Sequence, residues 1–232
     1  MKHVLLITVL GTAPGSAPAA DADVLATFDN GLEGWGTADI LGITTHVATG
    51  GNPGGYFQHD NSELQFSILI APEAYLGDLS GYIGGAFPFD GILLGDGGEF
   101  FNGPAGIPGG VFLDYGTIQI AGPAGTAQVD LLPGGTTPSL DGWQTYSIAL
   151  TGAAWGLSDA SFAAIMTDVT SLTINIEGLW GPEVNGVDNI ALRGATLVPL
   201  PGGLALFALS LLGLGAVRRS EPLSHPLTVD RR

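Results

Sequence analysis

The sequence predicts an all-β protein, a jelly-roll-like antiparallel β-sandwich with one short helix, and three observations lead to this fold class. Gly and Pro account for 38 and 15 of the 232 residues, so turns recur at short intervals and long helices are excluded. Segments between the turns are rich in Val, Ile, Thr and aromatic residues, and several alternate apolar with polar positions. Hydrophobic residues make up 45% of the chain, which is enough for a packed core.

Ten segments are expected to form strands because turn clusters bound each of them. The alternation is clearest at Leu172–Glu177. Leu172, Ile174 and Ile176 are expected to face the core, and Thr173, Asn175 and Glu177 are expected to face solvent. The ten segments are Val24–Phe28, Ile40–Val47, Tyr56–His59, Leu64–Ile70, Gly81–Phe89, Val111–Ile120, Ala127–Leu132, Trp143–Leu150, Ser171–Glu177 and Val187–Arg193. One short helix is expected at Ala160–Thr167, with Ser158 or Asp159 as its N-cap.

The charge distribution limits the class of partner. Twenty of the 22 carboxylates and one of the six basic residues, Arg193, lie within residues 21–194, so this stretch has a formal charge of −19. Such a surface repels phosphate backbones and anionic lipids, which excludes nucleic-acid binding, and it attracts divalent cations. The chain has no Cys, so disulfides and thiol chemistry are excluded.

The N-terminus, residues 1–22, has the layout of a secretory signal peptide. Lys2 precedes an apolar run, Val4–Leu10, and small residues then lead to a cleavage point between Ala19 and Ala22. The alternative is an N-terminal strand or buried helix. The sequence therefore predicts an exported domain at residues 23–194.

The C-terminus has the layout of a short membrane segment. Residues 198–217 carry no charge and are followed by Arg218 and Arg219. A helix of 20 residues spans about 30 Å, one hydrocarbon thickness. We expect a linker and sorting motif at 195–202, a transmembrane helix with a basic stop at 203–219 and a disordered tail at 220–232. The basic pair predicts a cytoplasmic C-terminus.

Val198, Pro199, Leu200 and Pro201, then the Gly/Leu/Ala-rich span and the Arg218–Arg219 pair, resemble the VPLPA variant of PEP-CTERM sorting signals. The resemblance implies an exosortase-type membrane protease as partner. It also implies removal of the tail and delivery to the cell surface or extracellular matrix.

The order of landmarks along residues 24–194 is similar to the laminin B domain (laminin IV type A). This resemblance implies a sandwich of the galactose-binding, carbohydrate-module type with an extracellular structural or adhesive role, and it does not imply catalysis. The landmarks are Phe28–Trp35, Gly54–Phe57, Phe66–Asp78, Trp143–Tyr146, Asp168–Leu172 and Gly186–Leu192.

One group of residues is a candidate cation site. Asp188 shares strand parity with Ile190 and Leu192, so its carboxylate is expected to point toward the core, where a charge needs a partner. Oxygen ligands and the absence of Cys favour Ca²⁺. Sandwiches of the type that this chain resembles join their first and last strands through calcium, which implies Asp29 as a second ligand and Asn30 and Glu33 as weaker ones. The alternative is that Asp188 and Asp29 cap turns through backbone N–H groups.

Seven aromatic residues are candidates for stacking on sugar rings in carbohydrate binding: Trp35, Tyr56, Phe57, Tyr75, Trp143, Trp155 and Trp180. Trp155 and Trp180 lie in predicted loops and are the candidate exposed rings, whereas Trp35 and Trp143 lie beside strand starts and are expected to fill the core or an edge.

No catalytic motif is present in the sequence, and the two histidines within 21–194, His46 and His59, are expected at the surface or in turns. We therefore expect a non-enzymatic, exported β-sandwich with a structural or adhesive role. A carbohydrate-binding module is the alternative, for which an aromatic strip on one sheet face would be the distinguishing feature, and a secreted glycoside hydrolase is a third.

Overall fold

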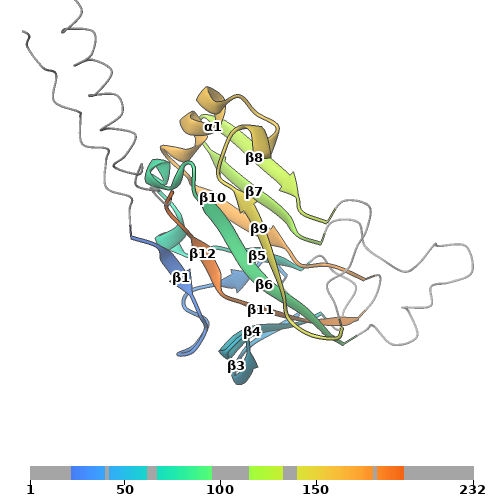
Figure 1. Ribbon diagram of the computed structural model, residues 1–232. Helices are drawn as coiled ribbons and strands as arrows, with labels where there is room; N and C mark the ends of the chain where they lie inside the picture. Colours follow the sequence, from blue (N-terminus) through green and yellow to red (C-terminus); the bar gives the residue numbers. More distant parts are fainter. Residues whose placement is uncertain are drawn as a thin grey trace, which may run out of the picture. The chain divides into compact units, whose positions relative to one another are not determined.

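A computed structural model describes residues 22–39, 42–61, 67–95, 115–132, 140–179 and 182–195. These residues form two five-stranded antiparallel sheets and a two-stranded ribbon (Figure 1), which confirms the predicted β-sandwich. Residues 1–21 of the predicted signal peptide, the sorting motif, the helix at 203–219 and the tail lie outside the described residues. Within the described part, no helix is both long enough and apolar enough to cross a membrane.

Sheet I has the strand order β2-β5-β10-β7-β8. Its register sets Leu172 opposite Ile120 and Ile174 opposite Ile118, so the predicted alternation of β10 buries one face. The strands are β2 (Gly36–Thr37), β5 (Ile68–Ile70), β10 (Ser171–Asn175), β7 (Thr117–Gly122) and β8 (Gly125–Asp130).

Sheet II has the order β3-β4-β11-β6-β9 and carries the candidate site. Its central strand β11 pairs with β4 at Val187↔Phe57 and with β6 at Gly186↔Ile92. The strands are β3 (Ile43–Gly51), β4 (Gly54–Asn61), β11 (Glu183–Asp188), β6 (Ala86–Gly95) and β9 (Gln144–Ala149).

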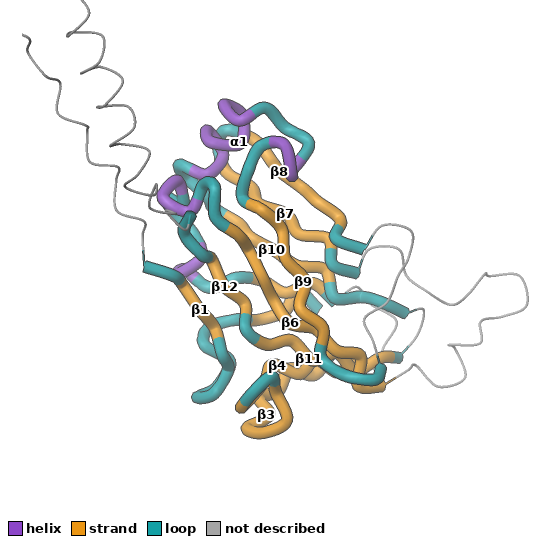
Figure 2. The backbone as a smooth tube through the Cα atoms, viewed as in Figure 1, coloured by secondary structure: helices purple, strands orange, loops and turns teal. Residues whose placement is uncertain are grey.

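The first and last strands of the domain, β1 (Val24–Ala26) and β12 (Ile190–Leu192), form the ribbon along one side of the sandwich (Figure 2). The single strand predicted at Val187–Arg193 is two strands, because Asn189 has a left-handed backbone with φ 50°. That residue reverses the side-chain alternation.

The core lies between the two sheets and is rich in aromatic rings. Tyr75, Tyr115, Phe28, Phe57, Phe87, Phe89 and Phe162 are among its largest fully buried side chains. Aliphatic side chains of sheet I, including Ile118, Ile120 and Ile174, complete the packing.

The predicted helix is α1 (Asp159–Met166), which lies beside β7 and β8. Its N-cap is Ser158, one of the two predicted caps, and the Ser158 hydroxyl accepts a hydrogen bond from the Ser161 N–H at 3.1 Å. Three short 3₁₀ helices, Glu73–Tyr75, Ser80–Tyr82 and Ala153–Trp155, were not predicted. The second of them replaces the start of the strand predicted at Gly81–Phe89, and β6 instead begins at Ala86.

Candidate carbohydrate-binding face

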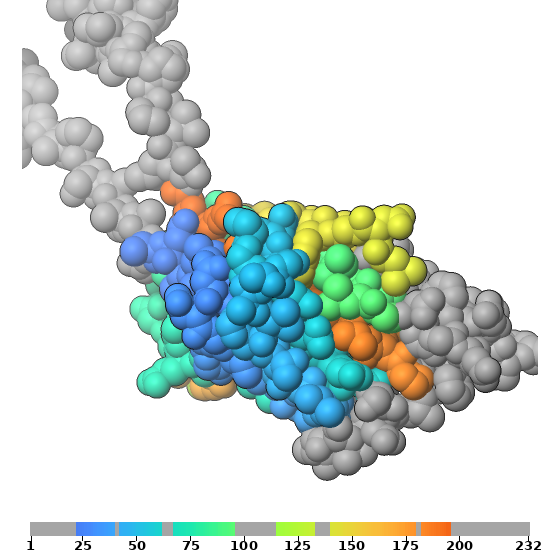
Figure 3. All heavy atoms as spheres, turned by 90° about the horizontal axis from the view of Figure 1, so that it is seen from below, coloured from blue at the N-terminus to red at the C-terminus, as the bar shows by residue number. Residues whose placement is uncertain are grey.

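The outer face of sheet II carries a group of aromatic and aliphatic side chains, in which Trp143 is partly exposed and Tyr56 and Ile92 are 8% and 9% exposed. Phe57 and Val187 point into the core, so the alternating positions Tyr56, Gln58 and Gly186 point outward. Segments of β3, β4, β11, β6 and β9 lie side by side on the surface in Figure 3.

Trp143, just before β9, lies across this face. Its Nε1–H donates to the Gly50 carbonyl at the end of β3 at 2.9 Å, although Gly50 is on the opposite edge strand of the sheet. The Tyr56 ring meets the indole edge-to-face, with 5.4 Å between ring centroids and an interplanar angle of 71°. Two contacts from different strands therefore fix the orientation of the indole.

Gly186 provides the space beneath the indole. A β-carbon at this position would lie 2.7 Å from Ile92 Cγ2, closer than real β-carbon contacts, and 3.0 Å from Trp143 Cη2, which is a tight contact. Leu94 lies next to them and is 42% exposed. We call Tyr56, Ile92, Trp143 and the Gly186 backbone the platform.

Polar groups border the platform. The Tyr56 hydroxyl donates to Gln58 Oε1 at 3.1 Å, and burial raises the pKa of Tyr56 above its usual value, so the phenol stays neutral. Thr145 on β9 is exposed on the same face. The arrangement combines one partly exposed indole with hydrogen-bonding groups near it.

A second group, the outer cluster, holds the β3–β4 turn (Gly50–Gly54) against sheet II and consists of Asn52, Asp90, Thr145, Asp188 and Asn189. Asp188 Oδ2 accepts from the Asn52 backbone N–H at 2.6 Å, and its Oδ1 accepts from the Asn189 N–H at 2.7 Å. Asp90 Oδ2 accepts from Asn189 Nδ2 at 2.8 Å and from Asn52 Nδ2 at 3.1 Å. Asp90 Oδ1 accepts from the Thr145 hydroxyl at 2.6 Å.

The predicted calcium ligands are only partly brought together. Asp29 and Asp188 both contact the β3–β4 hairpin, since Asp29 Oδ1 accepts from the Gly55 N–H at 3.2 Å. Burial raises the pKa of Asp188 to about 6, and the nearby charges of Asp90 and Asp29 act in the same direction. The two backbone N–H groups that donate to this carboxylate oppose the shift. Asn30 and Glu33 are exposed. These hydrogen bonds agree with the alternative that the sequence also allows, in which Asp188 and Asp29 cap turns by accepting from backbone N–H groups.

Asp188 is buried, as predicted, but not for the predicted reason. Val187 faces the core, so Asp188 projects from the opposite face of sheet II, and the β3–β4 turn covers it. In the part of the chain that the structure describes, no three or more His, Cys, Asp or Glu side chains are grouped as a metal site. Calcium binding stays a prediction.

The expectation that Trp155 is an exposed ring is wrong. Trp155 ends a 3₁₀ turn, is 4% exposed and packs against Phe162 with 5.6 Å between ring centroids. Its Nε1–H donates to the Ala149 carbonyl at 3.1 Å. It is a core residue, and Trp180 lies outside the described residues.

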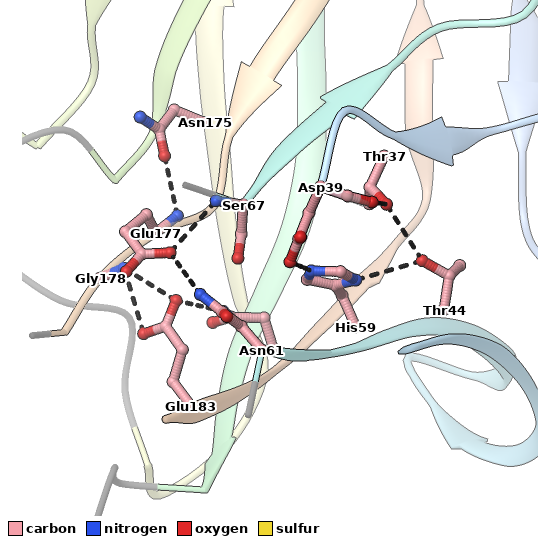
Figure 4. Close-up of polar contacts among 11 residues, drawn as sticks. Thr37, Asp39, Thr44, His59, Asn61, Ser67, Asn175, Glu177, Gly178 and Glu183 are labelled. Atoms are coloured by element: carbon pink, nitrogen blue, oxygen red, sulfur yellow. Dashed lines mark hydrogen bonds and ion pairs between the residues drawn. The ribbon is translucent and has the colours of Figure 1, made fainter. Parts of the chain in front are cut away.

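The sandwich interior contains polar side chains that the sequence did not indicate (Figure 4). His59 on β4 was expected at the surface but is fully buried. Its Nε2 lies 3.1 Å from Asp39 Oδ2 and its Nδ1 lies 3.1 Å from the Thr44 hydroxyl. Burial lowers the pKa of His59, while Asp39 opposes that shift.

The inner cluster consists of Asn61, Ser67, Glu177, Glu183 and Asn185. Asn61 on β4 and Glu183 and Asn185 on β11 belong to sheet II, whereas Ser67 precedes β5 and Glu177 follows β10 of sheet I. Glu177 Oε2 accepts from Asn61 Nδ2 at 2.9 Å and from the Ser67 N–H at 3.1 Å. Glu183 accepts from Asn185 Nδ2 at 2.7 Å and from the backbone N–H groups of Gly178 and Leu179 at 2.9–3.2 Å.

Burial raises the pKa of Glu177 to about 7 and that of Glu183 to about 8, and the charge of Glu177 adds to the shift of Glu183. The two side chains are 5% and 1% exposed, so a polysaccharide chain cannot reach them. This pair of carboxylates holds loops together and gives no support to the hydrolase alternative.

No family model matches the chain, and no curated protein matches it. Solved structures with a related fold include the L4b domain of human laminin alpha-2, at 12% identity and a TM-score of 0.45, over 60% of this chain and 80% of that one. The family 30 carbohydrate-binding module of a Clostridium thermocellum cellulosomal cellulase is 14% identical over 75% of this chain and 99% of that module, with a TM-score of 0.48. A xylan-binding domain from Paenibacillus barcinonensis is 12% identical over 77% of this chain and 98% of that domain, with a TM-score of 0.44.

Proposed function

We propose that this chain is a non-catalytic, exported β-sandwich that adheres to extracellular polysaccharide through the platform on sheet II. The observation that carries this proposal is Trp143, whose partly exposed indole is fixed across the outer face by Gly50 and Tyr56. A flat aromatic surface of this kind can stack on the C–H face of a sugar ring, and the neighbouring amide and hydroxyl groups can pair with sugar hydroxyls.

The charge of the domain narrows the proposed ligand. With a formal charge of −19 over residues 21–194, the domain repels polyanions, so we expect neutral polysaccharides to bind better than uronate-rich or sulfated ones. An adhesive role requires only retention on such a polymer and no bond cleavage.

The test is retention of the protein on immobilised neutral polysaccharides, with xylan, mixed-linkage β-glucan and agarose as probes. We expect Trp143→Ala to weaken binding at least tenfold, about 1.4 kcal/mol, because it removes the stacking surface. Leu25→Ala is the control, since Leu25 is 50% exposed on β1, outside sheet II, and should bind like wild type. Equal binding by Trp143→Ala and wild type, or no binding by wild type to any probe, contradicts the proposal.

Export and surface sorting are the second part of the proposal. The motif Val198–Pro201, the apolar span and the Arg218–Arg219 pair support sorting by an exosortase-type membrane protease, with the membrane as a temporary anchor through residues 203–219. Mass spectrometry of both termini of the mature protein tests the two predicted cleavages. A full-length chain in the cytosolic fraction would contradict them.

A further inference from the structure

The platform is held in place from a distance, through the β3–β4 turn. Trp143 donates its only N–H to the Gly50 carbonyl, so the orientation of the indole depends on where Gly50 lies. Gly50 is exposed and stands at the tip of a hairpin, where the β3–β4 pairing is irregular between Val47 and Gly51. The ladder alone therefore does not fix the carbonyl that orients the indole.

The outer cluster supplies the missing restraint. Its contacts converge on Asn52, two residues after Gly50: the backbone N–H donates to Asp188, the side-chain amide donates to Asp90, and the backbone carbonyl accepts from Asn189 Nδ2. Gly51 allows this close approach, because a β-carbon there would lie 2.7 Å from Asp188 Oδ2.

Asn189 connects Asn52 in the β3–β4 turn with Asp90 on β6. Its Nδ2 donates both to the Asn52 carbonyl and to Asp90 Oδ2. Its φ of 50° is a left-handed conformation that Asn and Gly adopt more readily than other residues do, and this conformation turns the amide toward the β3–β4 turn.

We infer that Asn189, acting with Asp90 and Asp188, is a positioning residue that fixes the β3–β4 turn and through it the Trp143 indole. This inference rests on the proposed function only for the identity of the ligand, a polysaccharide that binds the platform. Asn189 itself has no contact with Trp143 among the hydrogen bonds and ring contacts that the structure gives, so its effect passes through Asn52 and Gly50.

Two substitutions separate the backbone and side-chain roles of this residue. Asn189→Gly keeps the left-handed conformation available but removes the Nδ2 donor, whereas Asn189→Asp keeps the size and brings a carboxylate against Asp90. Asn30→Gly is a matched control, because Asn30 is an exposed turn residue that takes no part in the outer cluster.

The readout is the ¹⁹F spectrum of protein labelled with 5-fluorotryptophan, in which Trp143→Phe assigns the Trp143 resonance. In the absence of polysaccharide, we expect Asn189→Gly to shift or broaden that resonance while Trp35 and Trp155 stay unchanged, and Asn189→Asp to have a larger effect. Asn189→Gly should bind about threefold to tenfold more weakly than wild type to a polysaccharide that retains the wild-type protein. Asn30→Gly should bind like wild type.

An unchanged Trp143 resonance in both Asn189 variants would overturn the inference. The inference would also be overturned if all tryptophan resonances shifted together, since that would indicate general destabilisation. If the Trp143 resonance moves alone but wild type binds no polysaccharide, the positioning role stands and the proposed function fails.

Discussion

Sheet II carries one polar cluster on each of its faces, and the two use carboxylates in different ways. In the inner cluster, Glu177 and Glu183 are buried between the sheets and accept hydrogen bonds from amides that have no access to water. In the outer cluster, Asp90 and Asp188 hold a turn that lies beside the platform. Arg193 is the only basic residue within 21–194, so both clusters balance their carboxylates mainly with N–H groups.

The comparison separates stability from function. Each buried donor of the inner cluster depends on a carboxylate that water cannot replace, so a change there should act on the free energy of unfolding. The outer carboxylates Asp90 and Asp188 are equally buried, but their donors Asn52 and Thr145 are exposed. Water can therefore replace part of what these donors lose, so a change there should act mainly on the geometry of the platform.

The largest effect on stability is expected for Glu183→Ala. This substitution leaves the Gly178 and Leu179 N–H groups and the Asn185 amide buried without an acceptor, which should lower the free energy of unfolding by about 3 kcal/mol or more. Guanidinium titration measures the loss, and Glu73→Ala, at an exposed position, should stay within about 0.5 kcal/mol of wild type. A loss below about 1 kcal/mol for Glu183→Ala would remove the distinction between the two clusters.

The pH dependence of stability sharpens the same comparison. The pKa values of Glu177 and Glu183 rise from 4.5 to about 7 and about 8 on folding, so their contribution is complete below 4.5 and is lost as the pH rises through 7 and 8. His59 acts in the opposite direction, because burial lowers its pKa from 6.5 and its contribution is lost as the pH falls below that value. We therefore expect the midpoint of thermal unfolding to be roughly 3–8 °C higher at pH 6.5 than at pH 9.

Glu177→Gln is the matching variant, because the amide no longer titrates. It should flatten the slope between pH 6.5 and pH 9, whereas Glu73→Gln, at an exposed site, should leave the slope unchanged. Equal midpoints of thermal unfolding at the two pH values in wild type would show that the ionisation of Glu177 and Glu183 does not change the stability of the fold.

The sequence predicts the sheets better than it predicts either cluster, and the residues show why. Alternation along β10 depends only on neighbouring positions, so the burial of Leu172 and Ile174 follows from the local pattern. The same alternation predicts Glu177 on the solvated side, which is wrong. The chain leaves β10 after Asn175, and the partners of Glu177 are Asn61 and Ser67, more than 100 residues earlier. No local pattern contains that information.

A single backbone angle explains why the sequence pattern does not predict the outer cluster. Parity counted back from Ile190 points Asp188 inward, but the left-handed Asn189 reverses the count and turns Asp188 toward the β3–β4 turn. The Gly-Gly-Asn-Pro-Gly-Gly sequence of residues 50–55 indicates a turn but not where that turn lies on the sheet. The sequence allows Trp143 as a stacking ring but favours an edge or core position, because its partner Gly50 is 93 residues earlier and no local pattern shows that contact.

The smallest effect is expected from removing divalent cations, and it tests whether the outer cluster has a second role. If Asp29 and Asp188 bind Ca²⁺, as the sequence predicts, a chelator should lower the midpoint of thermal unfolding by several degrees, roughly 1–2 kcal/mol for a domain of this size. The effect should be modest because backbone N–H groups already satisfy both oxygens of Asp188.

Asp188→Asn separates the metal from the hydrogen bonds, since the amide keeps one acceptor oxygen but removes the charge that a cation requires. Its midpoint should be the same with and without chelator, while the Glu183→Ala variant should keep the full difference because the inner cluster lies on the other face of sheet II. If wild type has the same midpoint with and without chelator, calcium takes no part. The outer cluster then serves only to hold the β3–β4 turn.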